Sequence, residues 1–166
     1  MIFSMTKVYH ELEPIYDSDS KILILGSIPS VQSRKYGFYY SHPKNRFWKI
    51  LSIILDEKMP LNKDEKIKLL LKHKIALLDV IKKCDINGSS DLSIKDVECN
   101  DINKIIKESK VKIIFTTGRV AKKLYDKYCF EETLVDAIYL PSTSPANCKL
   151  SDDDIITEYK KIISYL

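Results

Sequence analysis

Four short apolar runs, separated by segments with a helical pattern, constrain the fold of this chain more than any other feature. The runs occupy residues 21–25, 75–78, 111–115 and 137–140. Runs this short and this apolar are typical of strands that are buried on both faces. Because a helical segment lies between successive runs, we expect the strands to pair in parallel, with helices on both faces of the sheet.

Helix starts and amphipathic faces define the segments between the runs. The expected helices are residues 46–55 and four segments that begin at Asn62, Asp101, Gly118 and Ser151. Ser151 is the clearest start, because its hydroxyl can accept a first-turn N–H and three aspartates follow it at the positive end of the helix dipole. Residues 85–100 are polar, and we expect a loop there.

Length and composition favour one domain. The 166 residues suit a single domain over 1–166, with residues 1–20 as an N-terminal extension packed on it. Acidic residues near the start argue against a signal peptide, and no apolar run is long enough to span a membrane. We therefore expect a cytoplasmic monomer that makes no membrane contact.

Cysteine and glycine patterns argue against two kinds of site. The cysteines have no CxxC spacing and no histidine in metal-ligand register, so we expect reduced structural thiols and no metal. The four glycines form no GxGxxG fingerprint, which argues against a dinucleotide-binding enzyme. The net charge of +4 permits a polyanionic partner without requiring one.

The loop after the first apolar run mixes aromatic and basic side chains. It reads GSIPSVQSRKYGFYYSHPKNRFW over residues 26–48. Aromatic faces can stack on a nucleobase, and cations can contact the phosphates beside it. The alternative is core packing beneath the loop, which we expect for Phe47 and Trp48. For Tyr39 and Tyr40 a base pocket is favoured, because loop tyrosines next to charge seldom form a core.

A second loop, after the last apolar run, supplies hydroxyl groups. It reads LPSTSPANCKL over residues 140–150. An ordinary strand-to-helix connection explains this composition equally well. Both loops follow the carboxyl ends of strands, which is where parallel sheets bind ligands.

Three segments together resemble the uracil-DNA glycosylase superfamily: GSIPS, FYYSHPKNRFW and STSPAN. The likeness is greatest to the DNA-deoxyinosine (hypoxanthine-DNA) glycosylase branch and extends from about Tyr16 to the C-terminus. HPKNRFWK is the most specific segment and also resembles a run in the mismatch-specific uracil/thymine branch. The resemblance implies a three-layer α/β/α sandwich with a four-stranded parallel sheet.

The same resemblance implies a hydrolase of base excision repair. Such an enzyme cleaves the N-glycosidic bond of a flipped-out deaminated base in double-stranded DNA, here hypoxanthine, and leaves an abasic site. It would be monofunctional and would need no cofactor. The alternatives are uracil, xanthine or mismatched thymine as the base, or a non-catalytic nucleic-acid-binding module.

Three positions depart from the patterns of other branches. Ile28 replaces a water-orienting Asn, Ser142 replaces a catalytic His, and Ala146 replaces a Leu that wedges into the duplex. The resemblance implies instead that catalysis depends on Asn45. Asn45 also precedes a helix that it could cap, and the two roles compete for the same side-chain oxygen.

The other expected site residues form two groups. The base pocket comprises Gly26, Ser27, Ile28, Pro29, Tyr39, Tyr40 and Ser142. The DNA-binding group comprises Lys44, Arg46, Ser144, Ala146, Asn147 and Lys149. Tyr40 is expected to stack on the base, and backbone N–H groups of residues 26–30 to face its oxygen. The nearest candidate for a general base is His42, although a structural hydrogen bond suits its place beside Pro43 equally well.

Overall fold

The computed structural model describes residues 5–28, 31–87 and 93–166. Its centre is a four-stranded parallel sheet with the order β3-β2-β6-β7. The strands are β2 (Ile22–Gly26), β3 (Ile75–Asp79), β6 (Ile113–Thr117) and β7 (Ala137–Leu140). Each strand overlaps an expected apolar run, so the predicted sheet is confirmed.

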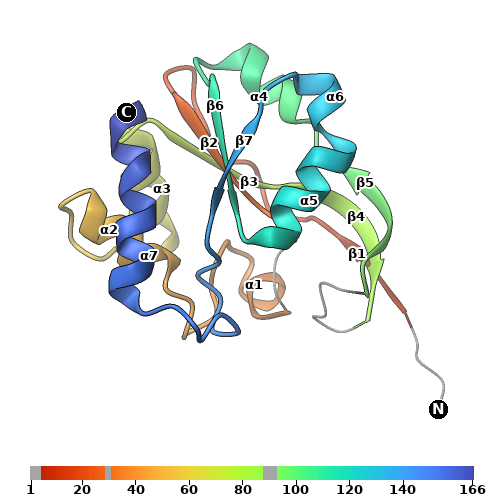
Figure 1. Ribbon diagram of the computed structural model, residues 1–166, viewed down its shortest axis with the longest axis horizontal. Helices are drawn as coiled ribbons and strands as arrows, with labels where there is room; N and C mark the ends of the chain where they lie inside the picture. Colours follow the sequence, from red (N-terminus) through yellow and green to blue (C-terminus); the bar gives the residue numbers. More distant parts are fainter. Residues whose placement is uncertain (1–4, 29–30, 88–92) are drawn as a thin grey trace.

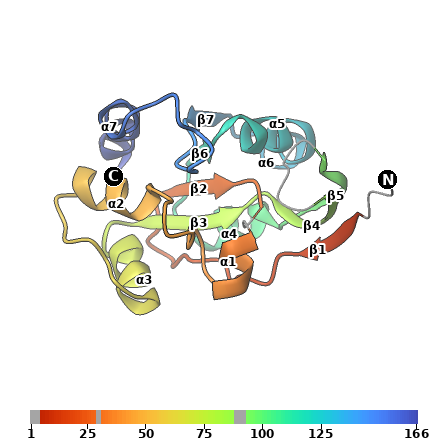
Figure 2. The same ribbon diagram turned by 90° about the horizontal axis from the view of Figure 1, so that it is seen from below.

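Helices cover both faces of this sheet (Figure 1). One face carries α2 (Phe47–Ile54), α3 (Lys63–Lys72) and α7 (Asp152–Tyr159), which continues into a 3-10 helix, η2 (Lys160–Tyr165). The other face carries α4 (Ile102–Glu108), α5 (Arg119–Tyr128) and α6 (Phe130–Thr133). Seen from below, the sheet runs between α2, α3 and α7 on one side and α5 and α6 on the other (Figure 2). The three-layer α/β/α sandwich is therefore confirmed.

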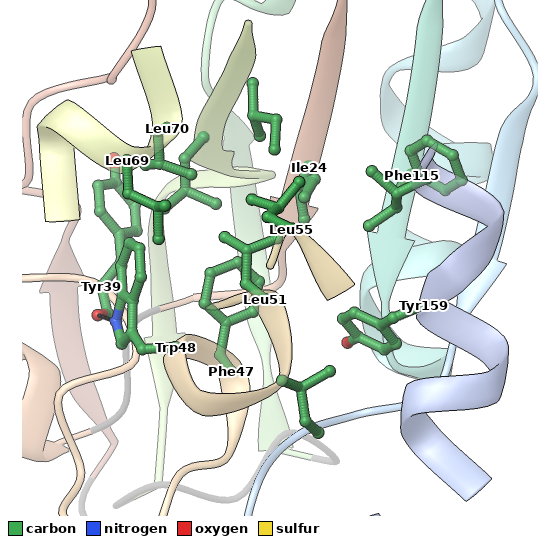
Figure 3. Packing of buried hydrophobic residues seen from close by; sticks show 14 of the residues in the cluster. Ile24, Tyr39, Phe47, Trp48, Leu51, Leu55, Leu69, Leu70, Phe115 and Tyr159 are labelled. Carbon is green, nitrogen blue, oxygen red and sulfur yellow. Dashed lines mark hydrogen bonds between the residues drawn. The ribbon is translucent and has the colours of Figure 1, made fainter. Parts of the chain in front are cut away.

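The side chains of strand β2, in the interior of the sheet, pack against the helices on both faces. Ile22 and Ile24 pack with α2, α3 and α7, whereas Leu23 and Leu25 pack with α4 and α5, and all four side chains are fully buried. Figure 3 shows Ile24 among the buried side chains of the first layer. Burying such a side chain contributes about 1.5–3 kcal/mol. The sheet is thus a rigid support for the loops at its ends.

Three helices begin at expected residues, and a side chain caps each of them. Asn62 Oδ1 accepts Glu65 N–H at 2.9 Å, and Asp101 Oδ1 accepts Lys104 N–H at 3.1 Å. Ser151 forms a full capping box with Asp154, since each side chain accepts the other's backbone N–H. The predicted helix starts are confirmed.

A second, antiparallel sheet lies beside the first. The prediction of a loop over residues 85–100 is wrong, because two strands of this sheet include residues of that range. Its order is β1-β4-β5, with β1 (Thr6–Tyr9), β4 (Ile81–Ile86) and β5 (Lys95–Cys99). The strands bury one face only, and register shifts between β4 and β5 break the apolar alternation. The sequences of β4 and β5 are polar and lack a regular apolar alternation, so they did not indicate strands.

The loop expected over residues 26–48 also contains structure, because α1 (Val31–Tyr36) forms within it. Among the described residues, no helix is long and apolar enough to cross a membrane. The same part of the chain holds no cluster of three or more His, Cys, Asp or Glu side chains that could bind a metal ion.

Candidate functional site

The candidate site lies where the four parallel strands end. Asp79 ends β3, Gly26 ends β2, Thr117 ends β6, and Ser142 follows shortly after β7. Figure 1 shows α1 and the segment 141–151 below the sheet, at this same edge. The topology therefore brings the polar side chains of Asp79, Thr117 and Ser142 and the backbone of Gly26 to one side of the molecule.

Gly26 is required by its neighbours. A Cβ at this position would collide with Asp79 Oδ1 and would lie 3.0 Å from the Tyr40 hydroxyl. The Gly26 carbonyl accepts Val80 N–H at 2.8 Å, which ties the end of β2 to the chain leaving β3. The absence of a side chain lets a carboxylate and a phenol approach the backbone together.

Tyr40 lies over the ends of β2 and β6. Its hydroxyl is 3.0 Å from Thr117 Oγ1, and its ring stacks on Phe47 with the centroids 4.0 Å apart and the planes at 14°. Its φ of 53° is unusual for a tyrosine, and such backbone strain is concentrated at functional sites. Burial and the nearby Asp79 carboxylate raise the pKa of Tyr40 above its ordinary 10.0, so the phenol keeps its proton at neutral pH.

Asp79 and His10 form a buried pair at the end of β3. His10 Nε2 lies 3.1 Å from Asp79 Oδ2, and their side chains are 1% and 5% exposed. Buried polar groups of this kind need partners, since an unpaired carboxylate in an apolar setting is costly. Sequence reasoning missed this pair, because 69 positions separate its members.

Asn45 connects the two loops. Its Oδ1 accepts Phe47 N–H at 2.9 Å, which caps the start of α2, and also accepts the Thr143 hydroxyl at 2.9 Å. The Phe47 N–H fixes the orientation of the amide, because only an oxygen can accept there. Within the described part of the chain, Asn45 Nδ2 has no hydrogen-bond partner. Asn45 Oδ1 thus accepts hydrogen bonds from within the protein, and the Nδ2 amide group is left as a hydrogen-bond donor.

The second loop is held in place from several directions. Thr143 is buried, and its carbonyl accepts Arg46 N–H at 3.1 Å. Asn147 Nδ2 donates to the Ser142 carbonyl at 2.9 Å. Gly118 has a φ of 89°, which favours glycine, and it lies beside Ser142. Ser142 therefore lies next to the end of β6.

The base-pocket assignment of Tyr39 is wrong. Its side chain is 2% exposed, and its hydroxyl donates to the Glu13 carbonyl at 2.9 Å. Its own carbonyl accepts Trp48 Nε1–H at 3.0 Å, and Figure 3 shows the two rings together in the core beside α3. Phe47 and Trp48 are core residues as expected. Tyr39 shares their role because it points away from the sheet edge.

Ile28 is partly buried. Its side chain packs against the apolar cluster of the second sheet, which contains Val8, Ile81, Cys84 and Ile86. The place of Ile28 in the base pocket stays a prediction. Pro29 lies outside the described residues.

Arg46 is a structural residue, contrary to the expected DNA contact. Its guanidinium donates to the Asn147 carbonyl at 2.7 Å and the Leu150 carbonyl at 2.9 Å, and pairs with Asp152 at 3.2 Å. These bonds hold the second loop against α7. Asn147 is committed to the same loop by its side-chain bond.

The other expected DNA contacts lie on the surface at this edge. Lys44, Ala146 and Lys149 are exposed, and Ser144 is partly buried with its hydroxyl accepting Ala146 N–H at 3.2 Å. His42 Nδ1 accepts Lys44 N–H at 3.0 Å and so stabilises its turn. Sequence reasoning also missed Thr117 and Thr143, whose hydroxyls contact Tyr40 and Asn45.

Comparisons with known proteins agree with this arrangement. The family model described as "Uracil DNA glycosylase superfamily" matches residues 13–165. A hypoxanthine DNA glycosylase of Methanosarcina acetivorans is 35% identical over 144 residues, which cover 82% of this chain and 87% of the relative. One of Methanosarcina barkeri is 37% identical over 109 residues, covering 64% of this chain and 68% of the relative. A solution NMR structure of a protein from Methanosarcina acetivorans, proposed to be a uracil DNA glycosylase, superposes with a TM-score of 0.76 and 29% identity, covering 92% of this chain and 96% of that one.

Proposed function

The chain belongs to the uracil DNA glycosylase superfamily, and on that premise we propose that this DNA glycosylase excises hypoxanthine. It would hydrolyse the N-glycosidic bond of a flipped-out deoxyinosine in duplex DNA and leave an abasic site. The two relatives named hypoxanthine DNA glycosylase support this choice of base.

The position of Asn45 carries the proposal. Ile28 is aliphatic and the Ser142 hydroxyl does not titrate near neutral pH, so neither supplies an acid or a base to the site. Asn45 is held by two hydrogen bonds through its oxygen, which leaves its NH₂ group to act. A preorganised donor of this kind stabilises charge at little reorganisation cost.

Breaking an N-glycosidic bond places negative charge on the departing base. Hypoxanthine carries acceptors at O6, N7 and N3, and Asn45 Nδ2 would donate to one of them as the charge develops. An amide cannot deprotonate water, and Asn45 Oδ1 already accepts two hydrogen bonds. The contribution of Asn45 would therefore be leaving-group stabilisation.

Tyr40 and Asp79 would bind the base. The face of Tyr40 turned away from Phe47 would stack on the ring, which is worth about 1–3 kcal/mol. The Asp79 carboxylate, held by His10, would accept the ring N–H that lies beside the carbonyl of a deaminated base. Adenine has an unprotonated acceptor at that ring position, so the same carboxylate would repel it.

A glycosylase assay tests the proposal. Duplexes carrying one hypoxanthine, uracil, xanthine or mismatched thymine are incubated with wild type and with Asn45→Ala, and abasic sites are revealed by alkali. We expect hypoxanthine to be released most efficiently and Asn45→Ala to be slower by about 10²–10³-fold. Strand cleavage should require the alkali, because a monofunctional enzyme leaves the backbone intact.

Two outcomes would overturn this function. If wild type binds lesion DNA without forming abasic sites, the protein is a binding module. If uracil is released while hypoxanthine is not, the base assignment is wrong. Uracil is the second candidate, because the solved structural neighbour was proposed to be a uracil DNA glycosylase and because uracil also presents a ring N–H beside a carbonyl.

A further inference from the structure

We propose that Tyr36 is the side chain that enters the duplex and fills the space left by the flipped-out nucleotide. This proposal rests on the proposed function, since a base that leaves the stack creates a hole in the duplex. Proteins that unstack DNA commonly insert an apolar or aromatic side chain at the opened step. The structure offers Tyr36 for this purpose.

The second loop offers only short apolar side chains for this purpose. Pro145 and Ala146 are exposed there, and Ala146 presents only a methyl group. The larger side chains of this loop are committed elsewhere or charged: Asn147 bonds the Ser142 carbonyl, and Lys149 carries an ammonium. A long side chain for an opened duplex therefore has to come from the opposite side of this edge.

Tyr36 stands on that opposite side. It ends α1, the helix that follows β2 at the site edge, and it is 59% exposed. The other exposed tyrosines described lie on β1, α5, β7 and η2: Tyr9, Tyr128, Tyr139 and Tyr165. Figure 1 shows α1 at the lower margin of the molecule, beneath the sheet edge.

The backbone beside Tyr36 forms a projecting corner. Gly37 has a φ of +69°, and a Cβ added to it would meet no atom within 4 Å. The chain then returns at once to the core through Phe38, which is 7% exposed, and Tyr39, which is 2% exposed. The exposed Tyr36 ring is thus attached to a backbone segment that the core holds in place. Insertion into a stack of nucleobases requires such a support.

Positive charge accompanies the ring. The ammonium of Lys35 lies 5.7 Å from the Tyr36 ring centroid, and exposed Lys44 lies further along the same loop. Phosphates flank every base step, so a cation beside an inserting ring would hold the backbone while the ring replaces the lost stacking.

Comparison of duplex and single-stranded substrates tests the proposal. Both carry the deaminated base that wild type excises best, and kcat/KM is measured for Tyr36→Ala, Tyr36→Phe and wild type. We expect Tyr36→Ala to lose about 10- to 100-fold on the duplex, as loss of one stacking contact predicts, and to stay within about twofold on the single strand. Tyr36→Phe should retain duplex activity, because the ring is what fills the hole.

A matched control and a direct readout complete the experiment. Tyr128→Ala removes another exposed tyrosine with a neighbouring lysine, since Lys127 Nζ lies 5.1 Å from its ring, and it should leave both activities unchanged. The fluorescence of 2-aminopurine placed beside the lesion should rise when wild type binds, and less when Tyr36→Ala binds.

The outcomes separate this proposal from the function on which it rests. A Tyr36→Ala enzyme that matches wild type on the duplex, or loses equally on both substrates, overturns the role of Tyr36 alone. A wild type that releases no deaminated base from either substrate overturns the proposed function, and the insertion proposal with it.

Discussion

The Thr143 hydroxyl donates to Asn45 Oδ1 at 2.9 Å and joins two loops that are 98 positions apart in the chain. The same oxygen accepts Phe47 N–H, so one side chain caps a helix and connects both halves of the site. Because the Asn45 oxygen makes both of these bonds, the Asn45 NH₂ group is the part that can donate to a ligand.

Removal of the Thr143 hydroxyl should weaken catalysis more than binding. Thr143→Val keeps the shape of this buried side chain but removes the donor to Asn45, so the amide gains freedom to rotate. We expect kcat on the hypoxanthine duplex to fall about tenfold, with KM little changed, which corresponds to a typical hydrogen-bond contribution. Thr143→Ser restores a hydroxyl and should recover most of the rate. Equal kcat in Thr143→Val and wild type would refute the positioning role.

Arg46 and Lys149 should respond differently to substitution. Arg46→Ala removes three interactions that hold the second loop, and we expect the free energy of unfolding to fall by about 2–3 kcal/mol. Lys149→Ala should leave stability unchanged but reduce the salt dependence of DNA binding by about one unit of slope. Urea unfolding and binding titrations at several salt concentrations measure the two effects. A reversed pattern would return Arg46 to the DNA-binding group.

Asp79 should govern discrimination between bases. Asp79→Asn keeps the size of the side chain but loses the charged acceptor, so we expect kcat/KM on hypoxanthine to fall about 10- to 100-fold, in line with a hydrogen bond to a charged group. Asp126→Asn is the matched control, because Asp126 pairs with Lys122 on the surface of α5. Full activity of Asp79→Asn on hypoxanthine would show that this carboxylate does not read the base.

The buried tyrosines should make the fold sensitive to alkali. Burial raises the pKa of Tyr39, Tyr40 and Tyr159 above the ordinary 10.0. Above pH 10.0 the unfolded chain loses phenolic protons that the folded chain retains, so stability is full below this pH and falls as the pH rises. Each phenol adds a slope of about 1.4 kcal/mol per pH unit.

Urea unfolding across the alkaline range checks this sign. Tyr159→Phe removes one buried phenol and should flatten the loss of stability, although it also removes the bond to the Pro141 carbonyl and lowers stability at neutral pH. Tyr9→Phe, at an exposed position, is the control. Identical alkaline slopes for the two variants would contradict the prediction.

The sequence was informative where burial is complete. The strand at Ile22–Gly26 could be predicted because both of its faces are buried, which leaves a continuous apolar run. The strand at Ile81–Ile86 could not, because only Ile81, Cys84 and Ile86 are buried and register shifts disturb their spacing. One-sided, irregular strands give a weak signal in any single sequence.

The two adjacent tyrosines show a similar limit within the site. Tyr39 and Tyr40 are identical in chemistry and neighbours in sequence, yet one bonds the Glu13 carbonyl in the core and the other reaches Thr117 at the sheet edge. Tyr40 has a positive φ, which composition does not encode. The His10–Asp79 pair could not be predicted for a related reason. Its two residues are far apart in the sequence, and only the tertiary fold brings them together.

Substitution of Asn45 by Asp tests the central claim most directly. Asn45→Asp keeps an oxygen for Phe47 N–H and for the Thr143 hydroxyl, so the cap and the link between the loops are retained, but it removes the NH₂ donor. Stability in urea and single-turnover release of hypoxanthine are measured together, with Asn45→Ala beside it. We predict that Asn45→Asp is as stable as wild type but at least about 10²-fold slower, whereas Asn45→Ala is slower and also less stable by about 1 kcal/mol. An Asn45→Asp enzyme that releases hypoxanthine as fast as wild type, or faster, would contradict the donor role of Asn45.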